Sequence, residues 1–198
     1  MSIDSVHMNV MLKTEAIARL VDVFRQYGYD GTSMAKIAEA TGLGKSSLYH
    51  HFPGGKEEMA TAVLDYLSQC LNTGLLAPLQ QSGEPLDRLR AMNRNIDQYY
   101  NHGQKACLLA MLAMGESSDR FRTQVSHILN SWIEAIAEVL IEADFEPELA
   151  RQRAEDAIIQ IQGAIILTQG LSTTAPFKRI LNHLPETLLQ PVIPSGLL

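Results

Sequence analysis

Two short helical patterns lie within residues 32–52, and their spacing constrains the fold more than any other feature of the chain. Gly42 separates them, and Thr32 or Ser33 can cap the start of the first. The second pattern buries Leu48 and Phe52 on one face and carries hydroxyl, basic and aromatic side chains on the other. This layout is typical of a helix-turn-helix that reads DNA, so it indicates a transcription regulator.

Apolar residues recur at helical spacing along the rest of the chain, and no alternating strand pattern interrupts them. We therefore predict an all-α protein in which the first ten or so residues fray. Residues 1–54 are expected to form a three-helix, helix-turn-helix DNA-binding head, and residues 55–198 a helical bundle for ligand binding and dimerisation. The predicted helices cover about residues 12–27, 33–42, 45–52, 56–77, 86–102, 105–115, 119–143, 148–171 and 176–189.

The net charge of -6 argues against a protein that coats nucleic acid over its whole surface. The acidity belongs to the C-terminal part, because residues up to Lys56 carry six basic and five acidic side chains. No apolar run approaches the roughly 20 residues that cross a bilayer, and the N-terminus lacks the pattern of a secretory signal. A cytoplasmic protein without a membrane partner is expected.

The exposed face of the second motif helix has the chemistry that contacts DNA. Lys45 can reach guanine acceptors or phosphate, and the hydroxyls of Ser46 and Ser47 can donate or accept at base edges. Tyr49 and His50 add phosphate hydrogen bonds or contacts with thymine methyl groups. Two flanking phosphate sites are also predicted, one at the helix start formed by Thr32 and Ser33 and one at Lys56.

The pattern Thr32-Ser33, Ile37-Ala38, Gly42-Leu43, Leu48-Tyr49-x-His51-Phe52 and Lys56-Glu57 resembles the tetracycline-repressor-like (TetR) family over about residues 12–64. The resemblance implies a homodimer formed by the last two helices, at about residues 148–171 and 176–189. It also implies DNA contacts, which map onto Ala35, Lys45, Ser46, Ser47, Tyr49, His50 and His51, with phosphates held near Thr32, Ser33 and Lys56.

Two further segments resemble the subgroup of the multidrug-efflux regulators LmrA and YxaF. They are the junction Pro53-Gly54-Gly55-Lys56 and the later Cys107-Leu108-Leu109. The junction is one residue longer than the commonest family form, which displaces Lys56 slightly. The function expected from the family is that of a ligand-responsive repressor, which binds palindromic operator DNA as a dimer and is released by a small apolar or amphipathic effector.

Met and aromatic residues of the middle region could line an effector cavity, because they give adaptable apolar walls with a few polar groups. The candidates are Tyr66, Met92, Tyr99, Met111, Met114, Trp132 and Ile136; the alternative is that they fill the helical core. Arg88, Arg90 and Arg94 could attract an anion, although a solvated helix face is the simpler interpretation. The predicted helix at 148–171 carries apolar residues on two faces, which favours a partner subunit.

Other classes of function find less support in the sequence. Gly42-Leu43-Gly44-Lys45-Ser46 is superficially similar to a phosphate-binding loop, but Glu39 stands where that loop needs glycine. His50 and His51 are adjacent and point to different faces of a helix, so no metal site is expected, and no cofactor is predicted. No catalytic residues are identified, which disfavours an all-helical enzyme. A protein-interaction module that keeps the motif without binding DNA stays open.

Overall fold

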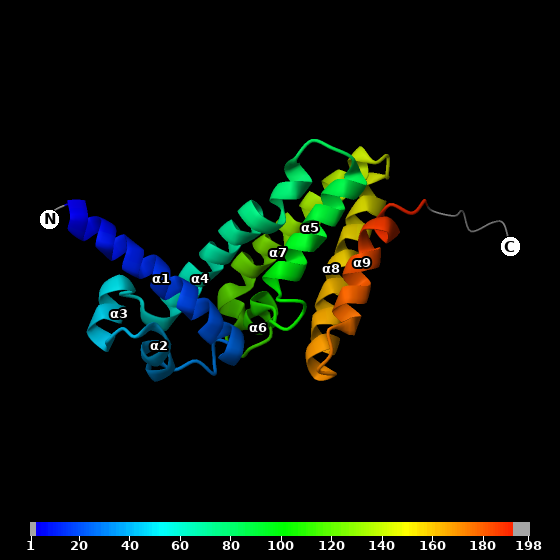
Figure 1. The fold of residues 1–198 in the computed structure, drawn as a ribbon. Coiled ribbons are helices and arrows are strands. Elements are labelled where there is room, and N and C mark those ends of the chain that lie inside the picture. The colour runs from blue at the N-terminus through cyan, green and yellow to red at the C-terminus, as the bar shows by residue number, and fades with distance from the viewer. Residues whose placement is uncertain (1–2, 192–198) are drawn as a thin grey trace. The chain divides into compact units, whose positions relative to one another are not determined.

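The computed structural model describes the backbone of residues 3–191 and the side chains of residues 13–191, and Figure 1 shows its helices. This part of the chain contains no strand, which confirms the all-α prediction. The α-helices are α1 (Ile3–Tyr27), α2 (Met34–Thr41), α3 (Lys45–His51), α4 (Gly55–Cys70), α5 (Pro85–Tyr99), α6 (Leu108–Ala113), α7 (Ser118–Glu142), α8 (Pro147–Gly170) and α9 (Ala175–Leu188).

The ends of the N-terminal helices lie where the sequence predicts them. The amide of Gly28 donates to the Phe24 carbonyl after α1, with φ of 65° at Gly28. The hydroxyl of Ser33 accepts from the Lys36 amide and caps α2. Gly42 ends α2 with φ of 69°, a left-handed conformation that costs glycine little because it lacks a Cβ.

Three boundaries differ from the prediction. α1 already begins at Ile3, because residues 3–12 contain neither glycine nor proline to stop a helix from forming. After α4 the chain continues in a π-helical turn, Leu71–Leu75, and a 3-10 helix, Ala77–Gln80. The helix predicted at 105–115 covers only Leu108–Ala113, because the chain first completes a turn in which the Lys105 amide donates to the Tyr100 carbonyl.

The chain forms two compact units. The first contains the residues up to Cys70 together with Cys107–Ile128, and in it α1 packs against α2, α4 and α6. The second contains Leu71–Ala106 together with the described residues from Leu129 onward, and in it α9 packs against α5 and α8. The boundary at residue 54 between DNA-binding and ligand-binding parts stays a prediction, since compactness does not test function.

Arg88 differs from the solvated arginine face that the sequence suggested. It is only 9% exposed, its Nε donates to the Leu79 carbonyl at 2.9 Å, and its guanidinium pairs with Glu142 of α7. This hydrogen bond from Arg88 holds the pKa of the Glu142 carboxyl below its usual value. The prediction is wrong for Arg88, because a carbonyl and a carboxylate in the same unit replace water around its guanidinium.

Within residues 3–191, none of the helices combines the length and the apolar composition that crossing a bilayer requires.

Candidate DNA interface

Three fully buried side chains fix how α2 and α3 present their outer faces. Ile37 of α2, Leu48 of α3 and Phe52 after α3 are each 0% exposed. Because these residues point inward, the opposite face of each helix points outward. Among the predicted DNA-contact residues, Ser33 and Ala35 around α2 and Lys45, Ser46, Tyr49 and His50 on α3 are exposed, and Ser47 is half-buried.

Lys45 is the one cation of the described head, residues 13–54, without a recorded partner among the described residues. Every other lysine or arginine of this segment contacts a carboxylate, a carbonyl or an aromatic ring. These pairs are Lys13 with the Phe52 ring, Arg19 with Glu15 and the Thr41 carbonyl, Arg25 with Asp22, and Lys36 with the Gly31 carbonyl and the Tyr27 ring. The ammonium group of α3 is therefore the one that an incoming phosphate or base edge can engage without breaking an internal contact.

The ring of Tyr49 lies against the backbone at the start of α4. A Cβ at Gly55 would lie 3.5 Å from Cε1 and 3.9 Å from the hydroxyl oxygen of Tyr49. Gly55 also has φ of 65°, so it serves both the tight junction and this close approach. Gly55 therefore contacts one side of the Tyr49 ring, and the residue is still 42% exposed, so the phenol is held in place and remains accessible.

Thr32 and His51, two of the predicted contact residues, point into the protein. The Thr32 hydroxyl donates to the Gly28 carbonyl at 2.6 Å, and Thr32 is only 2% exposed. His51 is 8% exposed, and burial lowers the pKa of its imidazole, with smaller contributions from His50 and Lys13. The structure therefore does not bring these two side chains to the outer face with Lys45.

Lys56 is joined to the loop that precedes α2. Its Nζ donates to the carbonyls of Tyr29 and Thr32, both at 3.0 Å, and lies 4.2 Å from the centroid of the Tyr29 ring. The ammonium can donate three hydrogen bonds, and two are already made. The structure thus gives Lys56 a positioning role, in which it connects the start of α4 to the loop before α2.

The contacts of Asp30 were not foreseen from the sequence. Its carboxylate accepts from the Ser117 hydroxyl at 2.5 Å and from the Ser117 amide at 3.3 Å. These bonds hold the pKa of the Asp30 carboxyl below its usual value. A Cβ at Gly115 would lie 2.5 Å from an Asp30 oxygen, so only glycine fits there without displacement. Asp30 and Ser117 are 87 residues apart, and no local pattern signals the pairing.

The residues predicted to line an effector cavity are distributed between the two units. Tyr66, Met111 and Met114 belong to the first unit, and Met114 is 75% exposed. Four belong to the second unit: Met92, Trp132 and Ile136 are buried, and Tyr99 is half-buried. Trp132 Nε1 is buried without a hydrogen-bond partner among the described residues.

No group of three or more His, Cys, Asp or Glu residues that could hold a metal ion occurs among the residues whose positions are described.

Two family models match the chain, one in its N-terminal part and one in its central and C-terminal part. Residues 16–63 match the bacterial regulatory proteins of the tetR family. Residues 85–183 match the C-terminal domain of LmrA/YxaF-like transcriptional regulators.

Individual relatives and solved structures extend this similarity over most of the chain. YxaF of Bacillus subtilis (strain 168), an uncharacterized HTH-type transcriptional regulator, is 26% identical over 82% of this chain and 87% of its own length. The HTH-type transcriptional repressor DhaR of Mycobacterium sp. (strain GP1) is 26% identical over 90% of this chain and 95% of its own. A TetR transcriptional regulator from Chloroflexus aurantiacus J-10-FL has the same fold, with a TM-score of 0.78, 24% identity and coverage of 94% of this chain and 98% of its own.

The matched segments include both the helix-turn-helix and most of the second compact unit. The proteins that they match are transcriptional regulators. The chain therefore belongs to the TetR family of bacterial transcriptional regulators, with a C-terminal domain of the LmrA/YxaF-like type, and it is not an enzyme.

Proposed function

We propose that the protein is a ligand-responsive repressor that binds palindromic operator DNA as a homodimer. The observation that carries the proposal is the outer face of α3, where the unpartnered Lys45 lies with the exposed Ser46, Tyr49 and His50. A short helix with such groups fits the major groove, where amino and hydroxyl groups meet base edges and phosphates. Ser33 and Ala35 extend this surface onto α2. Lys56 helps to position it, because its ammonium group binds the carbonyls of the loop before α2.

Exposed apolar side chains along α8 support the homodimer. Ile159, Ile166, Leu167 and Leu171 at its end are 66%, 67%, 51% and 63% exposed in the single chain. Large aliphatic side chains gathered on one helix favour burial by a partner, and a second copy offers the same surface under two-fold symmetry. We propose that α8 and α9, close to the predicted ranges 148–171 and 176–189, form this interface. Two heads related by a two-fold axis suit a palindromic site.

The buried indole of Trp132 supports an effector site in the second unit. Its Nε1–H has no acceptor among the described residues, and an unmade hydrogen bond in the interior costs about 1–3 kcal/mol. An apolar effector with one acceptor atom would satisfy this donor, and the buried Ile136 lies one turn further along the same helix, α7. Binding that favours one conformation of the dimer would then change operator affinity.

A fluorescence anisotropy titration on the DNA that flanks the protein's own gene tests DNA binding. Tyr49→Phe removes one hydroxyl from the proposed surface, and Tyr27→Phe removes the same group from a tyrosine of similar exposure, 39% against 42%. We expect about a three- to tenfold loss for each of the two heads, the cost of one hydrogen bond, and therefore about a 10- to 100-fold loss for the Tyr49→Phe dimer, with no change for Tyr27→Phe. Equal affinity in all three proteins would contradict the proposed phenol contact, and absence of salt-dependent binding would contradict the function.

Effector release is tested with the same operator DNA. Binding of a compound is followed by tryptophan fluorescence, because Trp132 is the single tryptophan of the chain and its emission therefore reports on this site. A small apolar compound that changes Trp132 emission should also weaken operator binding. A compound that saturates the emission change and leaves operator affinity unaltered would refute release by that site.

A further inference from the structure

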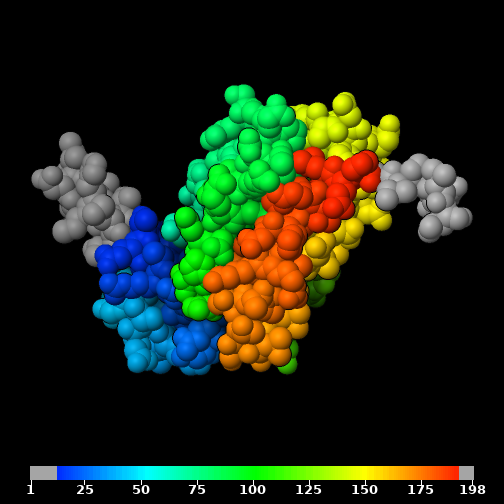
Figure 2. Space-filling view, turned by 45° about the vertical axis from the view of Figure 1, so that its right-hand side comes forward, coloured from blue at the N-terminus to red at the C-terminus, as the bar shows by residue number. Residues whose placement is uncertain are grey.

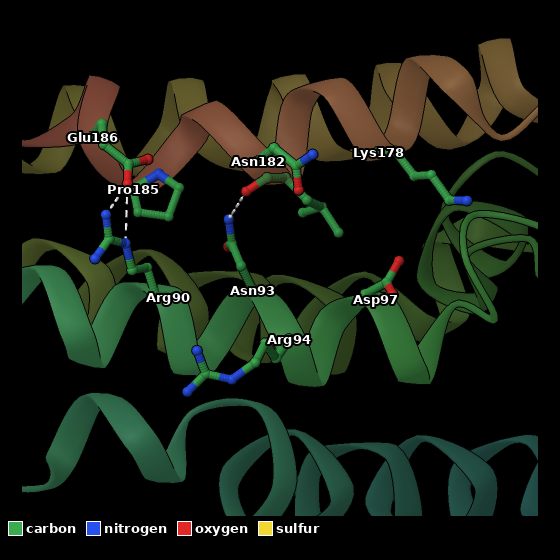
Figure 3. Close-up of a pocket in the computed structure, with 9 residues that line it drawn as sticks. Arg90, Asn93, Arg94, Asp97, Lys178, Asn182, Pro185 and Glu186 are labelled. Atoms are coloured by element: carbon green, nitrogen blue, oxygen red, sulfur yellow. Dashed lines mark hydrogen bonds and ion pairs between the residues drawn. The ribbon is translucent and has the colours of Figure 1, made fainter.

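A polar groove lies between α5 and α9 in the second unit. The two helices run side by side on the face shown in Figure 2, and Figure 3 shows the side chains between them. The groove has a volume of about 430 Å³, within the range of pockets that hold small molecules. Its lining residues are Arg90, Asn93, Arg94, Asp97, Lys178, Leu181, Asn182, Pro185 and Glu186, none of which belongs to the predicted effector cavity.

The charges along this groove leave an excess of cations. Arg90 pairs with Glu186 at 2.6 Å, and Asp97 accepts from His102 at 2.7 Å, so both carboxylates have partners. The side chains of Arg94 and Lys178 make no hydrogen bond or ion pair with any described residue. They border the groove from opposite helices, one from α5 and one from α9 (Figure 3). An anion entering the groove would find two uncommitted positive groups.

Two of the residues that line the groove each have a buried acceptor oxygen that lacks a partner among the described residues. Asn93 is 5% exposed, and its Nδ2 donates to the Leu181 carbonyl at 2.7 Å. That bond fixes the amide, yet the buried Oδ1 receives no hydrogen bond. Glu186 uses Oε1 for Arg90, and its buried Oε2 is likewise without a donor. Because buried acceptors are normally satisfied, these two oxygens indicate that a donor is missing.

We propose that the α5–α9 groove binds a small organic anion that also carries a hydroxyl or amino group. The anionic end lies between α5 and α9, where the long, flexible side chains of Arg94 and Lys178 can turn toward it. The hydroxyl or amino group donates to Asn93 Oδ1 and Glu186 Oε2. The anionic end pairs only with the two cations, and the hydroxyl or amino group pairs only with the two acceptor oxygens. A simple anion that lacks a donor leaves these oxygens unsatisfied, so the site discriminates against it.

Isothermal titration calorimetry on the full chain without DNA tests the proposal with two matched pairs of probes. Malate differs from succinate by one hydroxyl, and phosphoethanolamine differs from ethyl phosphate by one amino group. We expect the donor-bearing member of at least one pair to bind once per chain, and about tenfold more tightly than its partner. The pair that shows the difference identifies the anion as a carboxylate or a phosphate.

Variants locate the binding in the groove. Arg94→Gln and Lys178→Gln should each weaken the better probe about five- to tenfold, because each removes one charge-assisted hydrogen bond. Arg179→Gln makes the same change of charge on the neighbouring residue of α9, which does not line the groove, and should leave binding within about twofold. Saturation by none of the four probes, equal binding within both pairs, or an equal loss in Arg179→Gln would overturn the proposal. The titration contains no DNA, so its outcome is separate from that of operator binding.

Discussion

Replacing Ile166 by glutamate should dissociate the proposed dimer, and the exposure of this side chain sets the size of the effect. Full burial of an isoleucine side chain contributes about 1.5–3 kcal/mol. Because Ile166 is 67% exposed in the single chain, a partner can recover roughly two thirds of that amount, about 1–2 kcal/mol per chain. Two-fold symmetry doubles it to about 2–4 kcal/mol, and the dimer dissociation constant should rise roughly 30- to 700-fold.

Sedimentation velocity over a concentration series measures this change directly. The matched control is Ile141→Glu, which makes the same substitution at a 42% exposed isoleucine of α7, outside the proposed interface. The wild type and the Ile141→Glu variant should sediment as dimers at concentrations where Ile166→Glu is a monomer. An unchanged dissociation constant for Ile166→Glu, or an equal loss for Ile141→Glu, would refute the α8 interface.

Three further predictions concern the first unit. Gly42→Ala should destabilise the fold by roughly 1–2 kcal/mol in urea unfolding, because φ of 69° is costly for a residue with a Cβ. Gly44→Ala, at φ of -66°, should not, and an equal loss in both variants would contradict the role of the positive φ. Ser117→Ala, which removes the hydroxyl and keeps the amide donor, should raise the pKa of the Asp30 carboxyl toward its usual value in a carboxyl NMR titration, and an unmoved titration would show that the hydroxyl hydrogen bond does not depress it. Burial lowers the pKa of His51, so the unfolded chain takes up its proton first, and the wild type should lose stability as the pH falls below 6.5. His51→Gln should show a smaller loss between about pH 7.5 and about pH 5.5, and an identical loss would contradict the burial effect.

Local chemistry made much of the head predictable. Gly28 and Gly42 end helices because a left-handed residue is needed there, and Ser33 caps α2 because its hydroxyl accepts from the backbone three residues later. The inward positions of Leu48 and Phe52 follow from their spacing of four residues. Such features depend on neighbouring residues only, so the sequence is sufficient to predict them.

Contacts between distant segments were not predictable in this way. Arg88 has the same local spacing whether it faces water or the Leu79 carbonyl, so only the fold distinguishes a solvated face from a buried one. Lys56 matches a phosphate-contact position of the family pattern, yet its ammonium lies on two loop carbonyls. Asp30 meets Ser117 through tertiary packing alone.

The proposed partner of α8 and the proposed ligand of the α5–α9 groove cannot be read directly from the single chain. Each is inferred from what the single chain leaves exposed or unsatisfied: the aliphatic side chains around Ile166, and the oxygens of Asn93 and Glu186. The sequence raised an anion site near Arg90 and Arg94 as an alternative, and the structure adds the acceptor oxygens that give such a site its specificity.

The most direct test of the central claim is the salt dependence of operator affinity for the wild type and for Lys45→Gln. If the outer face of α3 lies on DNA, each bound dimer places two Lys45 ammonium groups there. The slope of log affinity against log salt concentration should then decrease in magnitude by up to about two in Lys45→Gln. Lys105→Gln, which removes an exposed charge outside the head, should keep the wild-type slope. A slope that is the same in the wild type and in Lys45→Gln would contradict the account.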